Sequence, residues 1–475
     1  MSCKSLFVSV MVSIPLALGG CATFHPRPLS PEKTVAAFSD RSLNGPGLCA
    51  FLEKNRVPAP IPGRAWTLKP LTLAAFYYQP SLAEARAQLL AANAARITAG
   101  ERPNPSISVN PAYDSAIPGN FSPWIVPVSL DWPIETAGKR GYRLQQARQL
   151  DLVARWNLCG ALWGVRSGVR AALLELYAAR RQASLLAREI KARKKVVRML
   201  EGQVSAGYLS SYEVTRARID LDKTILAGQA AAGRVLQARV ALAGTLGVSV
   251  RALENISLSF AGFKTFPRQL TRPRVQRWAL LNRADVRSAL ADYAVSQSAL
   301  QLQIATQYPD IHIGPGYAWN NGNAGDNQWS LGLTLTLPVL NRNEGQIAQA
   351  KANRKLAAAH FLTVQTAALT SIDSALAGYC SALSEVETAE GLLKNLRRRL
   401  VSVRAQVRAG EIEPLSLANA EVAYSAGAMD RLNALIQAQQ ALGRLEDAVQ
   451  SPLTLSPSKL AAAQTVPTPN EDLKK

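Results

Sequence analysis

The chain is poor in the residues on which active-site chemistry usually depends. Its 475 residues include only three histidines, His25, His312 and His360, which lie far apart in the sequence. None of the five cysteines belongs to a CxxC or CxxxC pair. This scarcity argues against a metal site, a disulfide framework and a bound cofactor. No set of nucleophile, base and orienting residue indicates an enzyme either.

Long apolar runs are also missing. The first one, Leu6–Leu18, follows Lys4 and is shorter than the stretch of about 20 apolar residues that a membrane-spanning helix needs. Residues 1–20 therefore have the pattern of a secretory signal peptide. The run ends in Gly19-Gly20-Cys21, which resembles the lipobox of bacterial lipoproteins. We accordingly expect a covalent lipid on Cys21.

The residue after this cysteine bears on the compartment. It is Ala22 and not the aspartate associated with retention in the inner membrane, so the sequence favours the outer membrane. No later segment is apolar for long enough to span a bilayer as a helix. Any further crossing must therefore be made of strands, because only helices and closed barrels satisfy their backbone groups in lipid.

Acidic residues are few relative to basic ones. The chain has 33 Asp and Glu against 54 Lys and Arg, a formal net charge of +21. An exported, lipidated chain does not routinely meet nucleic acid, and the basic residues are not interleaved with aromatics, so we expect no nucleic-acid partner. Attraction to anionic outer-membrane lipid and adaptation to an acidic exterior remain two open explanations of the charge.

Aromatic residues make up only 6% of the chain, and the middle is rich in Ala, Leu, Arg and Gln. This composition favours long helices over a compact sandwich. The segments Lys139–Val204 and Glu344–Val407 contain no proline, and each would form a helix roughly 100 Å long. Val169, Leu173 and Leu176 begin a series of apolar positions at three- and four-residue steps. This spacing predicts helix-on-helix packing, as in bundles, coiled coils or an α-barrel.

The sequence contains an internal repeat. The segment Pro105–Tyr113 aligns with Pro309–Tyr317 at an offset of 204 residues. Gln203-Val-Ser-Ala-Gly207 aligns with Gln406-Val-Arg-Ala-Gly410 at an offset of 203 residues. We therefore predict a duplicated chain in which each half has a helix, two strands, a very long helix, a glycine turn and a second long helix. The shorter helices that open the halves are expected at Ser81–Ala99 and Asp285–Thr306.

Four segments alternate apolar and polar residues, which is the pattern of strands with one apolar face. From Trp329 to Leu337 every second residue is apolar, and similar segments begin at Ile107, Trp124 and Ile311. Such segments match the roughly 9–11 residues of a transmembrane strand. A soluble sheet packed on helices would alternate equally well. Six aromatic residues near the strand ends resemble the girdles at membrane interfaces: Tyr113, Trp124, Trp132, Tyr317, Trp319 and Trp329.

Four strands cannot close a barrel alone. Single-chain barrels use about eight strands or more, and an open sheet edge is not tolerated in lipid. Several copies of the chain must therefore share one barrel. The polar connections Ser115–Ser122 and Asn320–Asn327 would then be its extracellular loops.

The two long helices end at glycines with the sequence context of a left-handed C-cap, Gly207 and Gly410. A new helix is predicted soon after each of them. Ser210 with an early acid resembles a capping box, and Pro414 suits a first helical turn. Basic residues crowd the helix ends, where we expect a solvated or partner-facing surface: Arg193, Lys194, Lys195, Arg198, Arg397, Arg398, Arg399, Arg404 and Arg408.

These features together resemble the TolC-like family of outer-membrane factors over roughly Leu71 to Leu453. The lipobox and the N-terminal segment resemble the lipoprotein branch, with CusC-like and CzcC-like members. The landmarks that carry the resemblance are Pro133 and Pro338, the turns at Ala206-Gly207 and Ala409-Gly410-Glu411, and the helix starts at Ala217 and Ala420.

The resemblance implies a mixed α and β membrane protein. Three protomers with four strands each would form a β-barrel continuous with a long periplasmic α-helical barrel. The expected divisions are 1–20 signal peptide, 21–70 lipidated segment, 71–255 first repeat, 256–275 linker, 276–453 second repeat and 454–475 a tail that we expect to be disordered.

In that family the helix hairpins close the periplasmic entrance through polar links. Alignment on the glycines assigns this role to Glu213 and Arg216 in the first hairpin, and to Ser416 and Asn419 in the second. Ser416 and Asn419 depart from the acidic pair of some members, and three charged residues lie close by: Arg408, Glu411 and Glu413. The acids among them are also what a helix dipole favours at a helix start, and this alternative stays open.

The resemblance further implies a homotrimeric, lipid-anchored exit duct in the cell outer membrane with a periplasmic extension. It would passively conduct substrates from an inner-membrane pump, RND-type, through a periplasmic adaptor. Metal ions and drugs are the expected cargo classes. A type I secretion duct is the first alternative, and a lipid-anchored periplasmic coiled-coil scaffold is the second.

Overall fold

The computed structural model describes residues 22–57, 65–116, 123–254, 256–267, 270–320 and 328–453. The expected signal peptide, Cys21 and the tail 454–475 lie outside the described residues, as do parts of both expected extracellular loops. The chain divides into two compact units, one up to Ser42 and one from Leu43 onward. The first contains helix α2 (Pro31–Ser39). The second contains all the other helices and strands of the described residues.

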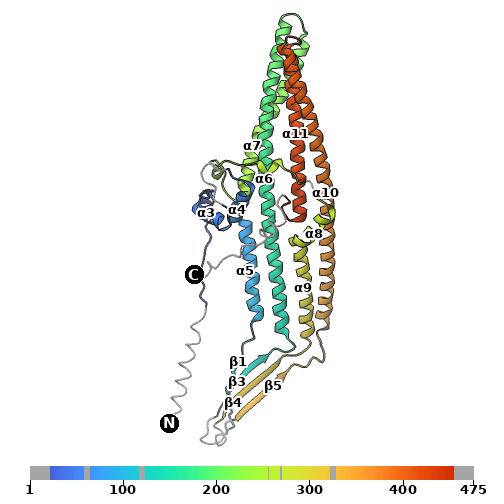
Figure 1. Ribbon diagram of the computed structural model, residues 1–475. Helices are drawn as coiled ribbons and strands as arrows, with labels where there is room; N and C mark the ends of the chain where they lie inside the picture. Colours follow the sequence, from blue (N-terminus) through green and yellow to red (C-terminus); the bar gives the residue numbers. More distant parts are fainter. Residues whose placement is uncertain are drawn as a thin grey trace. The chain divides into compact units, whose positions relative to one another are not determined.

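Four long helices form two hairpins in the second unit (Figure 1). Helix α6 (Lys139–Ser205) turns into α7 (Ser211–Leu246), and α10 (Glu344–Arg408) turns into α11 (Pro414–Val449). The 67 residues of α6 and the 65 of α10 correspond to lengths of about 100 Å. The predicted long helices are confirmed to within one residue at each end.

The duplication includes the shorter helices as well. Helices α5 (Pro80–Gly100) and α9 (Ala284–Ala305) open the two halves, as predicted. Before them stand α4 (Leu68–Tyr78) and α8 (Arg272–Asn282), each of 11 residues. Their start positions differ by the same 204-residue offset as the strands. Helix α8 therefore begins within 256–275, the range expected to be a linker.

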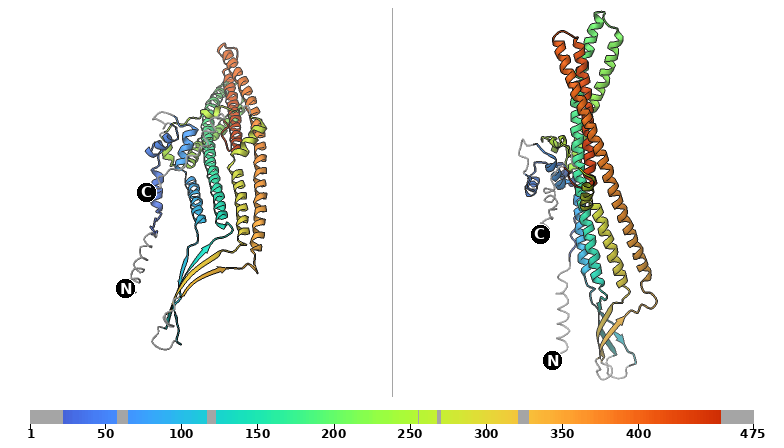
Figure 2. Two further views of the ribbon diagram at one scale, coloured as in Figure 1. Left: turned by 60° about the horizontal axis from the view of Figure 1, so that its bottom comes forward. Right: turned by 45° about the vertical axis from the view of Figure 1, so that its right-hand side comes forward.

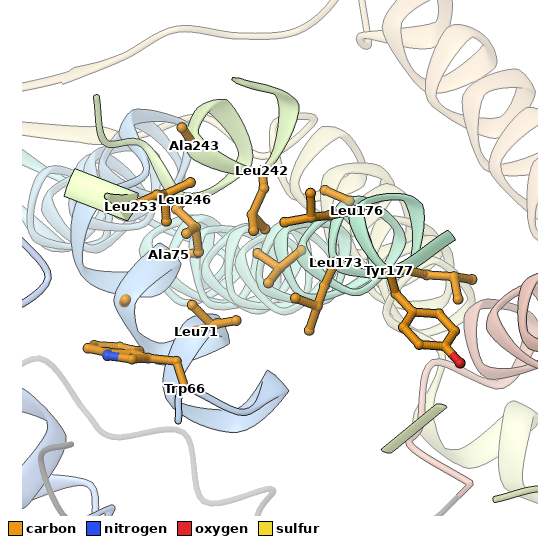
Figure 3. Packing of buried hydrophobic residues seen from close by; sticks show 14 of the residues in the cluster. Trp66, Leu71, Ala75, Leu173, Leu176, Tyr177, Leu242, Ala243, Leu246 and Leu253 are labelled. Atoms are coloured by element: carbon orange, nitrogen blue, oxygen red, sulfur yellow. The ribbon is translucent and has the colours of Figure 1, made fainter. Parts of the chain in front are cut away.

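The largest hydrophobic core surrounds the middle of α6. Side chains from α4, α6 and α7 meet there with α3 (Pro46–Lys54) and the 3₁₀ turns η1 (Val250–Leu253) and η2 (Ala261–Lys264). Figure 3 shows Leu71, Leu173 and Leu242 pointing toward one another from three of these elements. All three are at most 1% exposed. A second core lies between α8, α10 and α11 around Ile372 and Tyr379.

The predicted apolar series on α6 is confirmed over its first half, because Val169, Leu173 and Leu176 are all buried. Arg180 interrupts this series in the sequence. Its side chain is exposed, and the guanidinium carbon lies 5.7 Å from the centre of the Phe260 ring. The charged residue is therefore accommodated at the edge of the core by an aromatic face.

The strands form one antiparallel sheet at the end of the long helices opposite the hairpin turns (Figure 1). Its order is β1-β3-β4-β5, and β2 pairs with β3 next to β1. The strands are β1 (Ser106–Val109), β2 (Ala112–Tyr113), β3 (Trp124–Ile134), β4 (Ile311–Asn320) and β5 (Gln328–Leu335). Figure 2 shows the same sheet from two further sides.

Two strands differ slightly from the prediction. The first is divided into β1 and β2 around Asn110 and Pro111, because proline has no N–H for the ladder. The strand predicted to reach Leu337 ends at Leu335. Beyond it the Val339 N–H donates a 2.9 Å hydrogen bond to the Leu337 carbonyl, and this tight turn ends the extended conformation.

Candidate functional site: the sheet and the helix hairpins

One face of the sheet is apolar from edge to edge. The register pairs Ile107 with Leu130, Tyr317 with Val128, and Ile313 with Leu333. All four predicted apolar series therefore lie on the same side of the sheet. Several members are strongly exposed, among them Trp329 at 83%, Leu331 at 77% and Leu333 at 72%. Such a contiguous apolar surface requires a cover, and the described residues of the single chain do not provide one.

The opposite face is polar and composed of small residues. Ser106 pairs with Asp131, Gly316 with Ser129 and with Ser330, and Gly314 with Gly332. On this face the Nδ1 atom of His312 lies 3.1 Å from Oδ1 of Asp131. The sheet thus has the two contrasting faces of a wall between lipid and an aqueous interior.

The six predicted interface aromatics lie on the apolar face. Five of them, all except Trp132, lie toward the loop end of the sheet. Tyr113 and Trp124 face each other across two strands with ring centroids 5.2 Å apart, and Tyr317 and Trp329 do the same at 4.7 Å. Trp132 pairs with Ile313 near the helix end. Aromatic residues thus occur at both ends of the apolar face.

Polar contacts fix the connection between the sheet and the long helices. Lys139, the first residue of α6, places its Nζ atom 2.8 Å from Oδ1 of Asp310, just before β4. Thr136 donates to the same carboxylate through its backbone N–H at 2.9 Å. Burial opposes ionisation of Asp310, but these bonds outweigh it and hold its pKa below the usual range. The first strand pair and the second are thereby joined at the start of α6.

Both hairpin turns have the predicted left-handed glycine. Gly207 has φ of 78° and Gly410 has φ of 75°. After Gly207 the Tyr208 N–H donates to the Gln203 carbonyl at 2.9 Å, and after Gly410 the Glu411 N–H donates to the Gln406 carbonyl at 3.0 Å. This is the Schellman arrangement, which satisfies the last carbonyls of a helix. The two turns are equivalent in the repeat.

The following helix starts differ. Ser210 is the N-cap of α7 and accepts a 3.3 Å hydrogen bond from the Tyr212 N–H. Pro414 is the first residue of α11, as predicted. Ala217 and Ala420 stand in the second turn of their helices rather than at the start.

The predicted gate residues surround these turns. Arg216, Arg408 and Glu411 are exposed, and Glu213 is partly exposed. Ser416 and Asn419 are exposed on the first turns of α11. Glu413 is the member that links the hairpins, because its carboxylate accepts a 3.2 Å hydrogen bond from Nε2 of Gln203. The gate assignment of these residues stays a prediction.

Sequence reasoning missed a second link between the hairpins. The Nζ atom of Lys195 on α6 lies 2.9 Å from Oε2 of Glu421 on α11, and Arg404 on α10 lies 3.6 Å from the other oxygen of Glu421. The sequence offered one signal: Glu421 is an acid that follows the strongly basic end of the second long helix. The long sequence separation concealed its partners.

A buried polar cluster between α6 and α11 was also missed. Glu446 is 2% exposed, and one of its oxygens lies 3.2 Å from Arg166 and 3.5 Å from Arg170. Arg170 also donates to the Gln439 carbonyl oxygen at 3.0 Å and to its side-chain oxygen at 2.9 Å. Burial lowers the pKa of Arg170, which the Glu446 charge opposes.

Residues around this cluster fit it closely. A Cβ atom at Gly443 would lie 2.5 Å from Nη1 of Arg170, so the absence of a side chain there makes room for the guanidinium. Asp447 accepts hydrogen bonds from Nε1 of Trp163 at 2.9 Å and from the Ser167 hydroxyl at 2.8 Å. The two halves of the chain are thus joined by a fully hydrogen-bonded ionic group.

Within the described ranges, no three His, Cys, Asp or Glu residues converge as a metal site. None of the helices described there is both long enough and apolar enough to cross a membrane. Cys49, Cys159 and Cys380 are free thiols.

Comparison with known proteins agrees with this arrangement. The family model described as "Outer membrane efflux protein" matches residues 75–248 and 276–449, one match for each half of the duplication. The cobalt-zinc-cadmium resistance protein CzcC of Cupriavidus metallidurans is 23% identical over 221 residues. That alignment covers 46% of this chain, and the chain spans about half, 52%, of the length of this curated relative.

Solved structures share the fold. CusC, described in terms of transmembrane channel formation, superposes with a TM-score of 0.65 at 17% identity, over 80% of this chain and 91% of that one. The outer membrane protein VceC of Vibrio cholerae gives 0.65 at 17% identity, over 80% and 95%. The predicted fold class and family are confirmed, and the family is one of ducts rather than enzymes. The chain belongs to the outer membrane efflux protein family of TolC-like channels.

Proposed function

We propose that the chain is one protomer of a homotrimeric outer-membrane exit duct. The observation that carries this proposal is the sheet, which has one wholly apolar face and, among the described strands, two unpaired edges. Lipid is the cover that suits the apolar face, and further copies of the chain suit the edges. Because a closed ring has no edge, assembly would satisfy both needs at once.

The strand directions support closure by identical copies. The four strand positions alternate in direction across the antiparallel sheet, so β1 at one edge and β5 at the other run in opposite senses. The β5 edge of one copy can therefore pair antiparallel with the β1 edge of the next. Three copies give about twelve strands, within the range of outer-membrane barrels.

The helices have matching open sides. In the described part of the chain, α9 packs extensively on both α6 and α10, whereas α5 packs extensively on α6 but not on α10. Similarly, α11 packs on both α10 and α6, whereas α7 packs on α6 but not extensively on α10. The duplication implies that α5 and α7 would complete the pattern against α10 of a second copy.

Exposed apolar residues on α7 support this pairing. Leu226 and Val240 are 65% and 56% exposed. Leu226 is equivalent to Met429 at the 203-residue offset, and Met429 packs against the core that includes α6. The apolar side of α7 thus corresponds to the side of α11 that contacts a long helix.

The family and the similarity to CzcC support a proposal for the cargo and the partners. We propose passive passage of substrates delivered by an inner-membrane pump, RND-type, through a periplasmic adaptor, with metal ions or drugs as cargo. CzcC, named for cobalt, zinc and cadmium resistance, supports metal ions. The net charge of +21 does not itself favour cation attraction, so we assign discrimination to the pump. The lipid on Cys21 would anchor the duct in the outer membrane.

Glu213, Arg216, Arg408, Glu411, Glu413, Ser416 and Asn419 are proposed to line the periplasmic entrance around the turns at Gly207 and Gly410. The contact of Glu413 with Gln203 supports a closing role for this residue.

Channel recording in a planar bilayer, together with the mass of the purified protein in detergent, tests the proposal. We expect a trimer with small conductance steps that grow when Glu411→Ala and Glu413→Ala are combined. A trimer whose conductance is unchanged in that variant would remove these two residues from the gate. A non-conducting monomer would overturn the duct and favour a scaffold.

A further inference from the structure

The two hairpins contain an equivalent ion pair of opposite polarity. In the first hairpin Glu201 on α6 lies 2.5 Å from Arg218 on α7. In the second hairpin Arg404 on α10 lies 3.6 Å from Glu421 on α11. Arg404 follows Glu201, and Glu421 follows Arg218, at the same 203-residue offset that relates the glycine turns. Both hairpins therefore have this ion pair, but the acid is on the long helix in the first hairpin and on the return helix in the second.

This exchange affects the contact between hairpins. Within one chain the α6–α11 contact near the tips uses two carboxylates of the second hairpin. Glu421 is bound by Lys195 at 2.9 Å, and Glu413 accepts from Gln203 at 3.2 Å. At the 203-residue offset, Glu421 and Glu413 correspond to Arg218 and Ser210 of the first hairpin. Neither replacement is acidic.

The α10 side of the equivalent contact is exposed. On α6, Lys195 and Gln203 contact α11, and Ala192 and Met199 lie on the same side of the helix at three- and four-residue steps. None of these four residues is fully exposed. Their equivalents on α10 are Asn395, Arg398, Ser402 and Gln406, all of which are exposed. The α10 surface thus keeps the cation at Arg398 and the glutamine at Gln406, but has the polar Asn395 and Ser402 in place of Ala192 and Met199. In the described part of the chain, no helix covers it as α11 covers α6.

We propose that this α10 surface docks on α7 of a second copy, that Arg398 there meets Arg218, and that this seam between copies is the first to open at the tip. The inference rests on the proposed ring. The seam within a chain is attractive because Lys195 meets Glu421. The seam between copies places two cations together and pairs Gln406 with a neutral Ser210. Like charges in contact are destabilising, so the seams between copies are the weaker set.

Cysteine cross-linking tests the register of the seam. Cys49, Cys159 and Cys380 are first replaced by serine, and the mass in detergent is measured. In a trimer, Arg398→Cys with Arg218→Cys is expected to give oxidised dimers and trimers on denaturing gels. Lys195→Cys with Glu421→Cys is expected to close within one chain. A monomer overturns the proposed duct itself. A trimer in which the second pair reacts and the first does not overturns only the seam.

A charge exchange tests the opening. Glu201→Arg with Arg218→Glu preserves the ion pair of the first hairpin and presents Arg398 with a carboxylate. We expect the open probability in a planar bilayer to fall by at least about twofold, the scale of an exposed ion pair. Arg398→Glu should also lower the open probability in the natural background, where it faces Arg218. In the exchanged background the same substitution places two carboxylates together and should raise the open probability.

The decisive result is that Arg398→Glu changes the open probability in opposite directions in the two backgrounds. A general effect of net charge would change it in the same direction in both. Arg397→Glu serves as the matched control, since Arg397 is exposed one position earlier, on another side of α10. An Arg398→Glu effect of the same sign in both backgrounds, in proteins that still assemble, would overturn the proposed seam.

Discussion

At the scale of the residue, the loss of Glu446 should cost the protein much of its stability. This residue is almost fully buried and is the carboxylate that neutralises Arg166 and Arg170. Glu446→Gln keeps the size of the side chain but removes the carboxylate that pairs directly with both cations. Breaking a buried ion pair in this way costs about 3–5 kcal/mol. We expect a clear fall in the melting temperature followed by circular dichroism in detergent.

Glu390→Gln is the matched control for this substitution. Glu390 pairs with Arg431 at 2.8 Å, but both side chains are well exposed. Pairs of this kind contribute about 1 kcal/mol or less. An equal fall in melting temperature for the two variants would contradict the importance of the buried cluster.

Two aspartates on α9 should respond to pH in opposite ways. Burial raises the pKa of Asp292, although the nearby His360 opposes this. The contribution of Asp292 to the free energy of unfolding is therefore fully present below its unfolded pKa of about 3.9. It is lost as the pH rises through the pKa of the folded state. Asp292→Asn should raise the melting temperature at pH 7 and give no gain at pH 3.

Asp285 provides the opposite case. Burial works against its ionisation, but hydrogen bonds and charge from Arg283 prevail and lower its pKa. Its stability contribution is present above about pH 3.9 and is lost as the pH falls through the folded value. Asp285→Asn should lower the melting temperature at pH 7. A gain at neutral pH in this variant would contradict the ion pair with Arg283.

At the scale of the element, the two faces of the sheet should differ in their tolerance of a charged substitution. Leu333 lies on the apolar face and Thr334, which pairs with His312, lies on the polar face. Leu333→Lys would place a charge against lipid in the proposed barrel, at a cost of about 2–4 kcal/mol near the middle of the bilayer. We expect loss of the assembled, heat-modifiable form on gels. Thr334→Lys should preserve it, and equal tolerance of both would indicate a soluble sheet.

The elements were largely predictable because their signals are local. Alternation located the strands, and the absence of proline together with Gly207 and Gly410 located the long helices. The register that aligns the apolar residues of four strands follows from the same alternation, because a slip of one residue would reverse every side chain. The break at Pro111 could be explained by its missing N–H, but the alternation concealed it.

The contacts between elements were not predictable in the same way. Arg170 stands within an apolar series on α6, and nothing near it in the sequence indicates Glu446 or Gln439. The links of Lys195 to Glu421 and of Gln203 to Glu413 also join residues more than 200 positions apart. Periodicity shows which side of a helix is buried but not which helix covers it.

At the scale of the whole molecule, the proposed ring depends on the uncovered side of α7. Leu226→Glu would place a charge where α10 of the next copy is expected, with loss of roughly 1.5–3 kcal/mol of apolar burial at each contact. We expect fewer trimers in detergent by mass measurement. Ala227→Glu adds the same charge at a position whose equivalent, Asp430, is exposed on α11. If both variants assembled equally, the α7 surface would not be the contact.

The buried ionic cluster also constrains the order in which the chain matures. Arg166 and Glu446 are 280 residues apart, and the backbone N–H of Leu453 completes the hydrogen bonds of Glu446. While a chain is still being exported, the middle of α6 has its cations but not yet their counter-ion. The first half therefore cannot reach its final packing before the last helix arrives. The two repeats, although similar in design, must mature together as one cooperative unit.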